Sequence, residues 1–221
     1  MHIMKVINFA DTPSLVSRYM LELREVGIQK DPLRFRENLR RIGHAMAYEI
    51  SKQLRYRNTE IQTPLGKCVC QECDEQLVLA TILRAGMPLH QGFLDCFDRA
   101  ENAFVSAYRR YHEKGDDFDV VVEYLASPSI EGKTLLLVDP MLATGSSMLL
   151  GYQAMLTKGN PAHIHVASVI ASRQGIDFVR EHFPADKTTV WTGAIDESLN
   201  GHSYIVPGLG DAGDLAYGEK D

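Results

Sequence analysis

The chain has 221 residues, of which 45% are hydrophobic and 24% charged, the proportions of an ordinary globular protein. This length lies within single-domain range, and we expect one domain over residues 1–221. The net charge of −6 argues against a nucleic-acid binder, because affinity for a phosphate backbone usually needs a basic surface. No apolar run approaches the roughly 18–20 residues of a membrane span. The N-terminal sequence MHIMKVINFADTPSL lacks a signal-peptide core, so we expect a cytoplasmic protein.

Two helices are expected before residue 55. The first lies between Thr12-Pro13 and Gly27, and its apolar residues at helical spacing are Leu15, Tyr19, Leu23 and Val26. The second has Asp31 as its N-cap and Pro32 in its first turn. Its apolar stripe consists of Phe35, Leu39, Ile42, Met46, Ile50 and Leu54. The other face carries arginines that are either solvated or part of a subunit contact: Arg34, Arg36, Arg40 and Arg41.

Beyond residue 64, short apolar segments alternate with helical ones. We expect strands over Leu77–Leu83, Ala103–Tyr108, Val120–Leu125, Thr134–Val138, Ile164–Ile170 and Thr188–Ile195. Helices are expected over Ser146–Lys158 and Gln174–Phe183. Continuous apolar strands that alternate with helices are typical of a mostly parallel α/β sheet covered on both faces. Ligands of such sheets bind beyond the carboxyl ends of the strands, which directs attention to the loops there.

Four cysteines raise the question of a metal site. Cys68, Cys70 and Cys73 lie close together in the sequence, and Cys96 follows at a distance. A structural zinc site needs four ligands, usually as two separated pairs, and the second pair is missing. We therefore favour reduced thiols over zinc.

The stretch LLLVDPMLATGSSML, from Leu135 to Leu149, combines a buried strand, a carboxylate and a loop of small residues. The loop leads into a helix, whose first amides have no internal partners and carry the positive end of the helix dipole. Such a loop can surround a phosphate with backbone N–H groups, while Asp139 can accept hydrogen bonds from a sugar diol. The alternative is a plain strand-to-helix turn capped by serine. The loop is neither a Walker loop nor a GxGxxG loop.

The whole stretch is more specific than its parts. LLLVDPMLATGSS closely resembles the phosphoribosyl-pyrophosphate (PRPP) signature of type I phosphoribosyltransferases, and its DPMLATG form is similar to that of the uracil phosphoribosyltransferase family. Tyr204–Asp214, YIVPGLGDAGD, resembles that family's C-terminal uracil-binding segment. Shorter matches are Ile82–Gly86, Tyr108-Arg109 and Met46–Ile50. The matches occur in the family's order and span most of the chain.

This resemblance implies the type I phosphoribosyltransferase fold, an α/β fold with a mostly parallel central sheet flanked by helices and a small C-terminal hood that binds the base. It implies that Arg84, Ala85 and Gly86 hold the pyrophosphate, with forked guanidinium donors and a close backbone approach. Arg109 corresponds to a second PRPP arginine, at the start of the acidic loop 109–119.

The PRPP loop corresponds to Asp139, Pro140, Met141, Leu142, Ala143, Thr144, Gly145, Ser146 and Ser147. The resemblance places the 5′-phosphate at Thr144–Ser147 and the ribose hydroxyls near Asp139. The family usually has Gly at the position of Ser146. A serine there is tolerated if its backbone is helical, whereas a positive φ would be costly.

The resemblance places uracil against Ile205, Gly210, Asp211 and Ala212, with Asp211 also reaching PRPP or its metal ion. Uracil is flat and uncharged, so backbone N–H and C=O groups can recognise it where the chain folds tightly. Tight turns at Pro207, Gly208, Gly210 and Gly213 would allow this. Leu215 stands where the family commonly has Arg.

The implied reaction is Mg²⁺-dependent transfer of phosphoribose from PRPP to N1 of uracil, which yields UMP and pyrophosphate in pyrimidine salvage. Mg²⁺ would be held mainly by PRPP and water, with Asp211 as a further ligand candidate. Arg84 and Arg109 would stabilise the leaving pyrophosphate, while Asp139 or Asp211 would favour positive charge on the ribose. No side chain is assigned as the proton acceptor for N1.

The resemblance also implies a homo-oligomer, a dimer or tetramer, and GTP is a candidate effector because it activates some relatives. No nucleic-acid or membrane partner is expected. The alternative function is a non-catalytic regulator on the same fold that binds PRPP or nucleotides.

Overall fold

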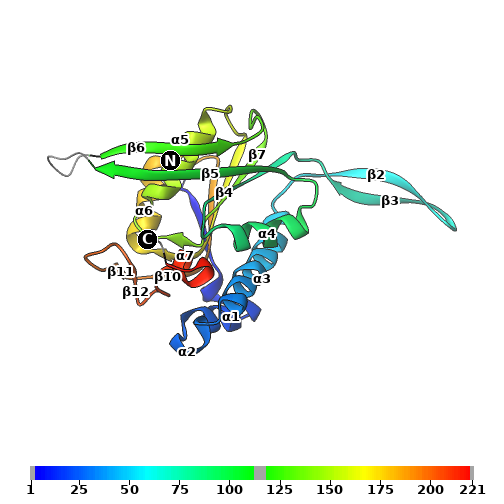
Figure 1. Cartoon of the computed structure of the whole chain (residues 1–221). Coiled ribbons are helices and arrows are strands. Elements are labelled where there is room, and N and C mark those ends of the chain that lie inside the picture. Colours follow the sequence, from blue (N-terminus) through cyan, green and yellow to red (C-terminus); the bar gives the residue numbers. More distant parts are fainter. Residues whose placement is uncertain (1–2, 112–117, 220–221) are drawn as a thin grey trace.

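A mostly parallel sheet forms the centre of the molecule (Figure 1). The computed structural model describes residues 3–111 and 118–219, although not the side chains of 107–122. In this part of the chain the sheet has eight strands in the order β1-β10-β9-β7-β4-β5-β6, with β8 beside β9. All pairings are parallel except β5 with β6. The strands are β1 (Lys5–Asn8), β4 (Leu77–Ile82), β5 (Glu101–Tyr111), β6 (Phe118–Ala126), β7 (Thr134–Val138), β8 (Met141–Leu142), β9 (His163–Ser172) and β10 (Thr188–Asp196).

Helices cover both faces of this sheet and produce two hydrophobic cores. One face carries α1 (Leu15–Arg24), α3 (Pro32–Ser51) and α4 (Met87–Cys96), and the other carries α5 (Ser146–Leu156) and α6 (Arg173–His182). Successive residues of a strand point to opposite faces, so Leu77 and Leu79 belong to the first core, whereas Val78 and Ala80 belong to the second. The α/β architecture expected from the sequence is therefore confirmed.

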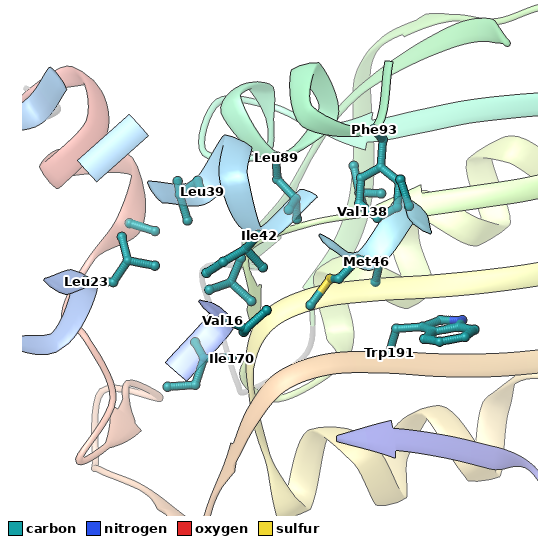
Figure 2. Close-up of a cluster of buried hydrophobic side chains, with 14 of the residues drawn as sticks. Val16, Leu23, Leu39, Ile42, Met46, Leu89, Phe93, Val138, Ile170 and Trp191 are labelled. Carbon is teal, nitrogen blue, oxygen red and sulfur yellow. The ribbon is translucent and has the colours of Figure 1, made fainter. Parts of the chain in front are cut away.

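Helix α3 supplies much of the first core. Asp31 caps its first turn by accepting hydrogen bonds from the N–H groups of Leu33 and Arg34, with Pro32 at the helix start. All six residues of the predicted stripe are buried, although Leu54 lies beyond the end of α3 at Ser51. Figure 2 shows Leu39, Ile42 and Met46 of this stripe among side chains from the sheet and the neighbouring helices.

The first helix differs from its prediction. Ser14 caps α1, and the helix ends at Arg24 because Glu25 is extended and starts the short helix α2 (Val26–Gln29). Leu15 and Val26, two residues of the predicted stripe, are 72% and 63% exposed. The buried face consists instead of Val16, Met20 and Leu23, together with the polar Glu22.

The arginines of α3 are bound within the chain. Arg34 contacts buried Glu22, and Arg40 donates to Asp95 of α4. Arg36 donates to the carbonyl oxygen of Ala216 in α7 (Ala212–Tyr217), with an Nη1–O distance of 2.7 Å. Arg41 donates to the side chain of Asn38. These contacts connect α3 to α1, α4 and the C-terminal helix. The arginine-bearing face of α3 is therefore not simply exposed to solvent.

Two small antiparallel pairs lie outside the central sheet: β2 (Tyr56–Thr63) with β3 (Gly66–Cys73), and β11 (Ser198–Leu199) with β12 (Ile205–Val206). The hairpin β2–β3 extends away from the body of the molecule (Figure 1). A short 3-10 helix covers Phe9–Asp11. In the described ranges, no helix combines the length and apolarity needed to cross a membrane.

Two glycines allow α3 and α4 to approach closely. A Cβ at Gly92 would lie 2.1 Å from the carbonyl oxygen of Arg40, and one at Gly43 would lie 2.6 Å from that of Leu89. These backbone atoms cannot move aside as a flexible side chain can, so any side chain at either position would push the helices apart.

We predict that Gly92→Ala lowers the free energy of unfolding by about 1–3 kcal/mol, as overpacking of a close contact does. Gly66→Ala is the matched control, because nothing lies within 4 Å of a Cβ there. Urea denaturation of both variants would test this, and equal midpoints for the two would contradict it.

Candidate active site

A pocket of about 230 Å³ opens at the carboxyl edge of the sheet, beyond β4 and β7. Its walls come from the loops after these strands and from the C-terminal segment. Eight of the residues predicted for the site line it: Arg84, Ala85, Asp139, Met141, Ala143, Gly210, Asp211 and Ala212. The position agrees with the rule that open α/β sheets bind ligands beyond the carboxyl ends of their strands.

Asp139 leaves β7 at the floor of the pocket. Its N–H donates to the carbonyl oxygen of Ala167 at 3.1 Å, which continues the pairing of β7 with β9. Its carboxylate accepts a hydrogen bond from the N–H of Met141 at 3.2 Å and is otherwise enclosed. Burial raises the pKa of Asp139 to about 7, and the hydrogen bond from Met141 only partly offsets this. Hydrogen bonds from the hydroxyl groups of a ligand would stabilise the ionised form of this carboxyl group.

The loop after Asp139 turns into α5 at Gly145, whose φ of 84° favours glycine. A Cβ at Gly145 would also lie 2.5 Å from the ring of Phe178 in α6. Ser172 fixes the other side of the loop, because its hydroxyl donates to the carbonyl oxygen of Ala143 at 2.5 Å and accepts from the N–H of Gly175. The first amides of α5 are thereby held in place next to the pocket.

Ser146 is the first residue of α5 and has a helical backbone. The positive φ of the loop is therefore at Gly145 and not at Ser146. The hydroxyl of Thr144 donates to the hydroxyl of Ser146 at 3.0 Å and accepts from the N–H of Ser146 at 3.3 Å. The helical backbone that a serine at residue 146 requires is therefore present.

Arg84 follows β4 and points toward the C-terminal helix. Its Nη2 lies 3.6 Å from Oδ1 of Asp214 and 3.4 Å from the carbonyl oxygen of Gly218. Its Nε is buried and has no hydrogen-bond partner among the described residues. Two residues further on, a Cβ at Gly86 would lie 2.1 Å from the hydroxyl of Thr81, so the chain can fold back tightly there only with glycine.

A charged contact between α1 and β10 helps to anchor the C-terminal segment to the body. Arg24 of α1 donates to both carboxylate oxygens of Asp196, at 2.8 and 2.9 Å, and also to the carbonyl oxygen of Gly208. The N–H of Gly208 donates back to Asp196 at 2.8 Å. Burial alone would raise the pKa of Asp196, but the hydrogen bonds from Arg24 and Gly208 lower it.

Glycine is required at residue 208. Its φ is 62°, and a Cβ there would lie 2.0 Å from the carbonyl oxygen of Ile205. Asp211 then caps α7, because Oδ1 accepts hydrogen bonds from the N–H groups of Gly213 and Asp214 at 2.8 and 3.0 Å. The tight turns expected in this segment are therefore present, and the Asp211 carboxylate has a structural task as well as a place in the pocket wall.

Several predicted site residues lie beside the pocket and do not line it. Ile205 and Leu142 are buried in the cores. Gly86, Pro140 and the segment 144–147 also lie outside the lining. Arg109 is part of β5, but its side chain is outside the described part of the structure, as are residues 112–117 of the acidic loop.

The sequence interpretation assigned no role to Ser203, which lines the pocket with Tyr204. Ser203 has a φ of 63°, unusual for a residue other than glycine, in the turn between β11 and β12. The side chain of Asn200 holds this turn by accepting hydrogen bonds from the N–H groups of His202 and Tyr204. The sequence Asn200-Gly201 is a turn signal that could have indicated it.

No group of three His, Cys, Asp or Glu side chains able to hold a metal ion occurs in the described residues. Cys68, Cys70 and Cys73 are exposed on β3, with the sulfurs of Cys68 and Cys70 3.8 Å apart. The pocket instead combines the carboxyl groups of Asp139 and Asp211 with the guanidinium of Arg84. Oxygen donors of this kind suit Mg²⁺ when a substrate supplies further oxygens.

Comparison with known proteins identifies the family. A family model described as uracil phosphoribosyltransferase matches residues 12–219. The chain belongs to the uracil phosphoribosyltransferase family. It is 57% identical over 217 residues to a uracil phosphoribosyltransferase of Porphyromonas gingivalis, covering 98% of this chain and 100% of the relative. A uracil phosphoribosyltransferase of Methanothermobacter thermautotrophicus is 40% identical over 190 residues, covering 85% of each chain.

A solved structure supports the fold of this uracil phosphoribosyltransferase family member. The AQ2163 protein from Aquifex aeolicus superimposes with a TM-score of 0.84 at 26% identity, over 96% of this chain and 98% of that one. The type I phosphoribosyltransferase fold expected from the sequence is confirmed. The matched residues 12–219 include the whole pocket, from Ile82 to Gly213.

We predict that Asp139→Asn stabilises the unliganded protein more at pH 8 than at pH 5. The pKa of Asp139 is raised in the folded state, so the folded protein binds more protons than the unfolded chain between about pH 4 and 7, and wild-type stability falls as the pH rises through that range. Asparagine removes this penalty and can still accept from the N–H of Met141.

The stability difference between the variant and the wild type should grow by about 2–3 kcal/mol from pH 5 to pH 8, since one pKa unit corresponds to about 1.4 kcal/mol. Urea unfolding at both pH values measures it. A difference that does not change with pH would show that the Asp139 carboxyl group is not buried in this way.

Proposed function

We propose that the chain transfers phosphoribose from PRPP to N1 of uracil and releases UMP and pyrophosphate, which is a step of pyrimidine salvage. The observation that carries this proposal is the meeting of two segments at one pocket. The loop after β7, suited to a phosphorylated ribose, faces the tightly folded segment 203–213, which is suited to a flat base. Family membership supports the same reaction.

PRPP would bind with its 5′-phosphate on the amides at the start of α5, assisted by the hydroxyls of Thr144, Ser146 and Ser147. This binding uses the positive end of the α5 dipole and the fixed conformation at Gly145. Asp139 would accept hydrogen bonds from the ribose hydroxyls, and these donors would favour its ionised form. Arg84, Ala85 and Gly86 would hold the pyrophosphate, with Arg109 as the second PRPP arginine implied by the family resemblance.

Uracil would lie against Gly210, Asp211 and Ala212, with the buried side chain of Ile205 supporting this wall from beneath. Backbone N–H and C=O groups of the segment would pair with the base carbonyls and ring N–H groups. Tyr204, which is half-exposed at the pocket mouth, adds an aromatic surface next to the base. The uracil-type C-terminal segment argues against a purine, which would need a different base pocket.

The charged side chains of the pocket explain why the proposed reaction needs Mg²⁺. The described charged residues of the pocket are Arg84, Asp139 and Asp211, so the protein alone supplies less positive charge than a pyrophosphate group requires. Mg²⁺ would supply positive charge to the pyrophosphate and would be held mainly by PRPP and water, with Asp211 as a further ligand candidate. Arg84 stabilises the charge that develops on the leaving group, while Asp139 and Asp211 favour the positive charge that develops on the ribose.

The chain would act as a single-domain cytoplasmic enzyme in a dimer or tetramer, with GTP as a candidate effector. The hairpin β2–β3 supports an oligomer, because a two-stranded hairpin is marginally stable in water by itself. Its turn residue Leu65 is 99% exposed, and Val69 is 65% exposed. Contact with another subunit would cover these side chains.

We predict that purified protein with Mg²⁺ and PRPP forms UMP from uracil and no nucleotide from cytosine, hypoxanthine or orotate, as followed by chromatography. Arg84→Ala should lower the rate by about 10²–10³-fold, the loss typical for removal of one charge-stabilising donor. Arg55→Ala is the control, since Arg55 is exposed at the opposite edge of the sheet. PRPP binding without any product would favour the non-catalytic regulator instead.

We predict that two substitutions separate the roles of Asp211. Asparagine caps a helix about as well as aspartate, so Asp211→Asn should keep the wild-type melting temperature and lose activity through the missing charge. Asp211→Ala should lose activity and also about 1 kcal/mol of stability, because the N–H groups of Gly213 and Asp214 lose their acceptor. Thermal denaturation and UMP assays on both variants measure this. Full activity of Asp211→Asn would exclude a role for the charge.

A further inference from the structure

The guanidinium of Arg84 has two sides with different surroundings. On one side, Nη2 contacts the C-terminal helix, 3.6 Å from the Asp214 carboxylate and 3.4 Å from the carbonyl oxygen of Gly218. On the other side, Nε is buried without a hydrogen-bond partner among the described residues. Arginine carries five N–H donors in a fixed planar fork, so a contact at Nη2 fixes the direction of the remaining donors.

The partner of Arg84 sits on a firmly held support. Asp214 belongs to α7, and its N–H donates to the capping carboxylate of Asp211. Arg36 of α3 donates to the carbonyl oxygen of Ala216, and its guanidinium lies 6.0 Å from the ring centre of Tyr217. Ala212 and Ala216 are buried against the first core. The Asp214 carboxylate therefore has a fixed position relative to the sheet that carries Arg84.

We propose that Asp214 is a positioning residue, which holds the Nη2 edge of Arg84 and so sets the direction from which the guanidinium meets the pyrophosphate of PRPP. This inference rests on the proposed function, because it assigns Asp214 a task toward the arginine that binds the leaving group. Asp214 itself is not among the residues that line the pocket.

The arrangement also connects the two substrate sites. The helix that carries Asp214 begins at Asp211, in the wall proposed for uracil, and the arginine it holds begins the loop proposed for pyrophosphate. The backbone of Gly213 lies between them, where an added Cβ would be 4.0 Å from Nη2 of Arg84. Substitution of Asp214 should therefore weaken mainly the binding of the pyrophosphate group. Unfolding of α7 would also disturb the pocket wall proposed for uracil.

The experiment compares Asp214→Asn with Glu219→Gln in steady-state kinetics and in calorimetric binding of PRPP and pyrophosphate with Mg²⁺. Glu219 is an exposed carboxylate just beyond α7, so its variant changes the net charge equally without touching Arg84. For Asp214→Asn we expect KM for PRPP and Kd for pyrophosphate to rise together by about tenfold. KM for uracil should change less than about twofold, and the melting temperature by less than about 2 °C. Glu219→Gln should behave as the wild type.

A double-mutant cycle gives the decisive readout. In the Arg84→Lys background, Asp214→Asn should weaken pyrophosphate binding by less than about twofold, because a lysine ammonium lacks the second edge that Asp214 would orient. Additive effects of the two substitutions would overturn the proposal, as would tighter PRPP binding by Asp214→Asn or a rise in KM for uracil equal to that for PRPP. If the wild type forms no UMP, the proposed function fails. If the wild type forms UMP and Asp214→Asn matches it, only the positioning role fails.

Discussion

The parallel pairing of β4 with β7 determines where the polar groups of the pocket lie. Leu77 to Thr81 pair with Thr134 to Val138, and all of these residues are buried, so neither strand can expose a charged side chain along its length. Charges can appear only where the strands end. Because the two strands run in the same direction and end at the same edge, Arg84 and Asp139 emerge on the same side of the molecule. The opposite edge of the sheet remains available for packing and for the hairpin β2–β3.

The pocket contains buried polar groups that lower the stability of the unliganded protein. The Asp139 carboxyl group is buried with a single hydrogen-bond donor, and Nε of Arg84 lacks a partner among the described residues. Unmet hydrogen-bonding capacity of this kind destabilises a folded protein unless packing elsewhere compensates. Here the compensation comes from two large cores on either side of the sheet and from the anchored helix α3. In the reaction that we propose, the ribose hydroxyls of PRPP would supply the donors that the Asp139 carboxyl group lacks.

Strong local patterns made much of this structure predictable. The stripe of α3, its Asp31 cap, the apolar strands β4 and β7 and the glycine-led start of α5 were all found from residue spacing. The strands β1 and β8 of the sheet were missed, and β5, β6 and β9 were predicted too short by a few residues, because the ends of apolar runs depend on tertiary pairing. The buried face predicted for α1 was wrong, because a glutamate is expected to be exposed. Glu22 is buried instead, where its carboxylate accepts hydrogen bonds from Asn38 and Arg18. These bonds lower the pKa of Glu22 to about 2 despite its burial.

No sequence pattern indicated the hairpin β2–β3 or the strand β1. The hairpin β2–β3 is polar on both faces and has no alternation of apolar residues, and β1 is only four residues long at the edge of the sheet. For the candidate site, the motif positions came from family resemblance, whereas the lining role of Ser203 and the contact between Arg84 and Asp214 depend on how the C-terminal segment folds back. Such long-range contacts cannot be derived from spacing, because they join residues more than 100 positions apart.

The anchoring of the C-terminal segment has an evolutionary consequence. Arg24 and Asp196 hold the backbone of Gly208, and no base-facing side chain takes part in that contact. Gly208 must stay a glycine, but exposed side chains of the same segment, such as those of Tyr204 and Val206, can change without disturbing either the anchor or the loop after β7. A chain of this architecture is thus able to change the surface of one pocket wall through a few substitutions near its end, while the loop on the other wall stays as it is.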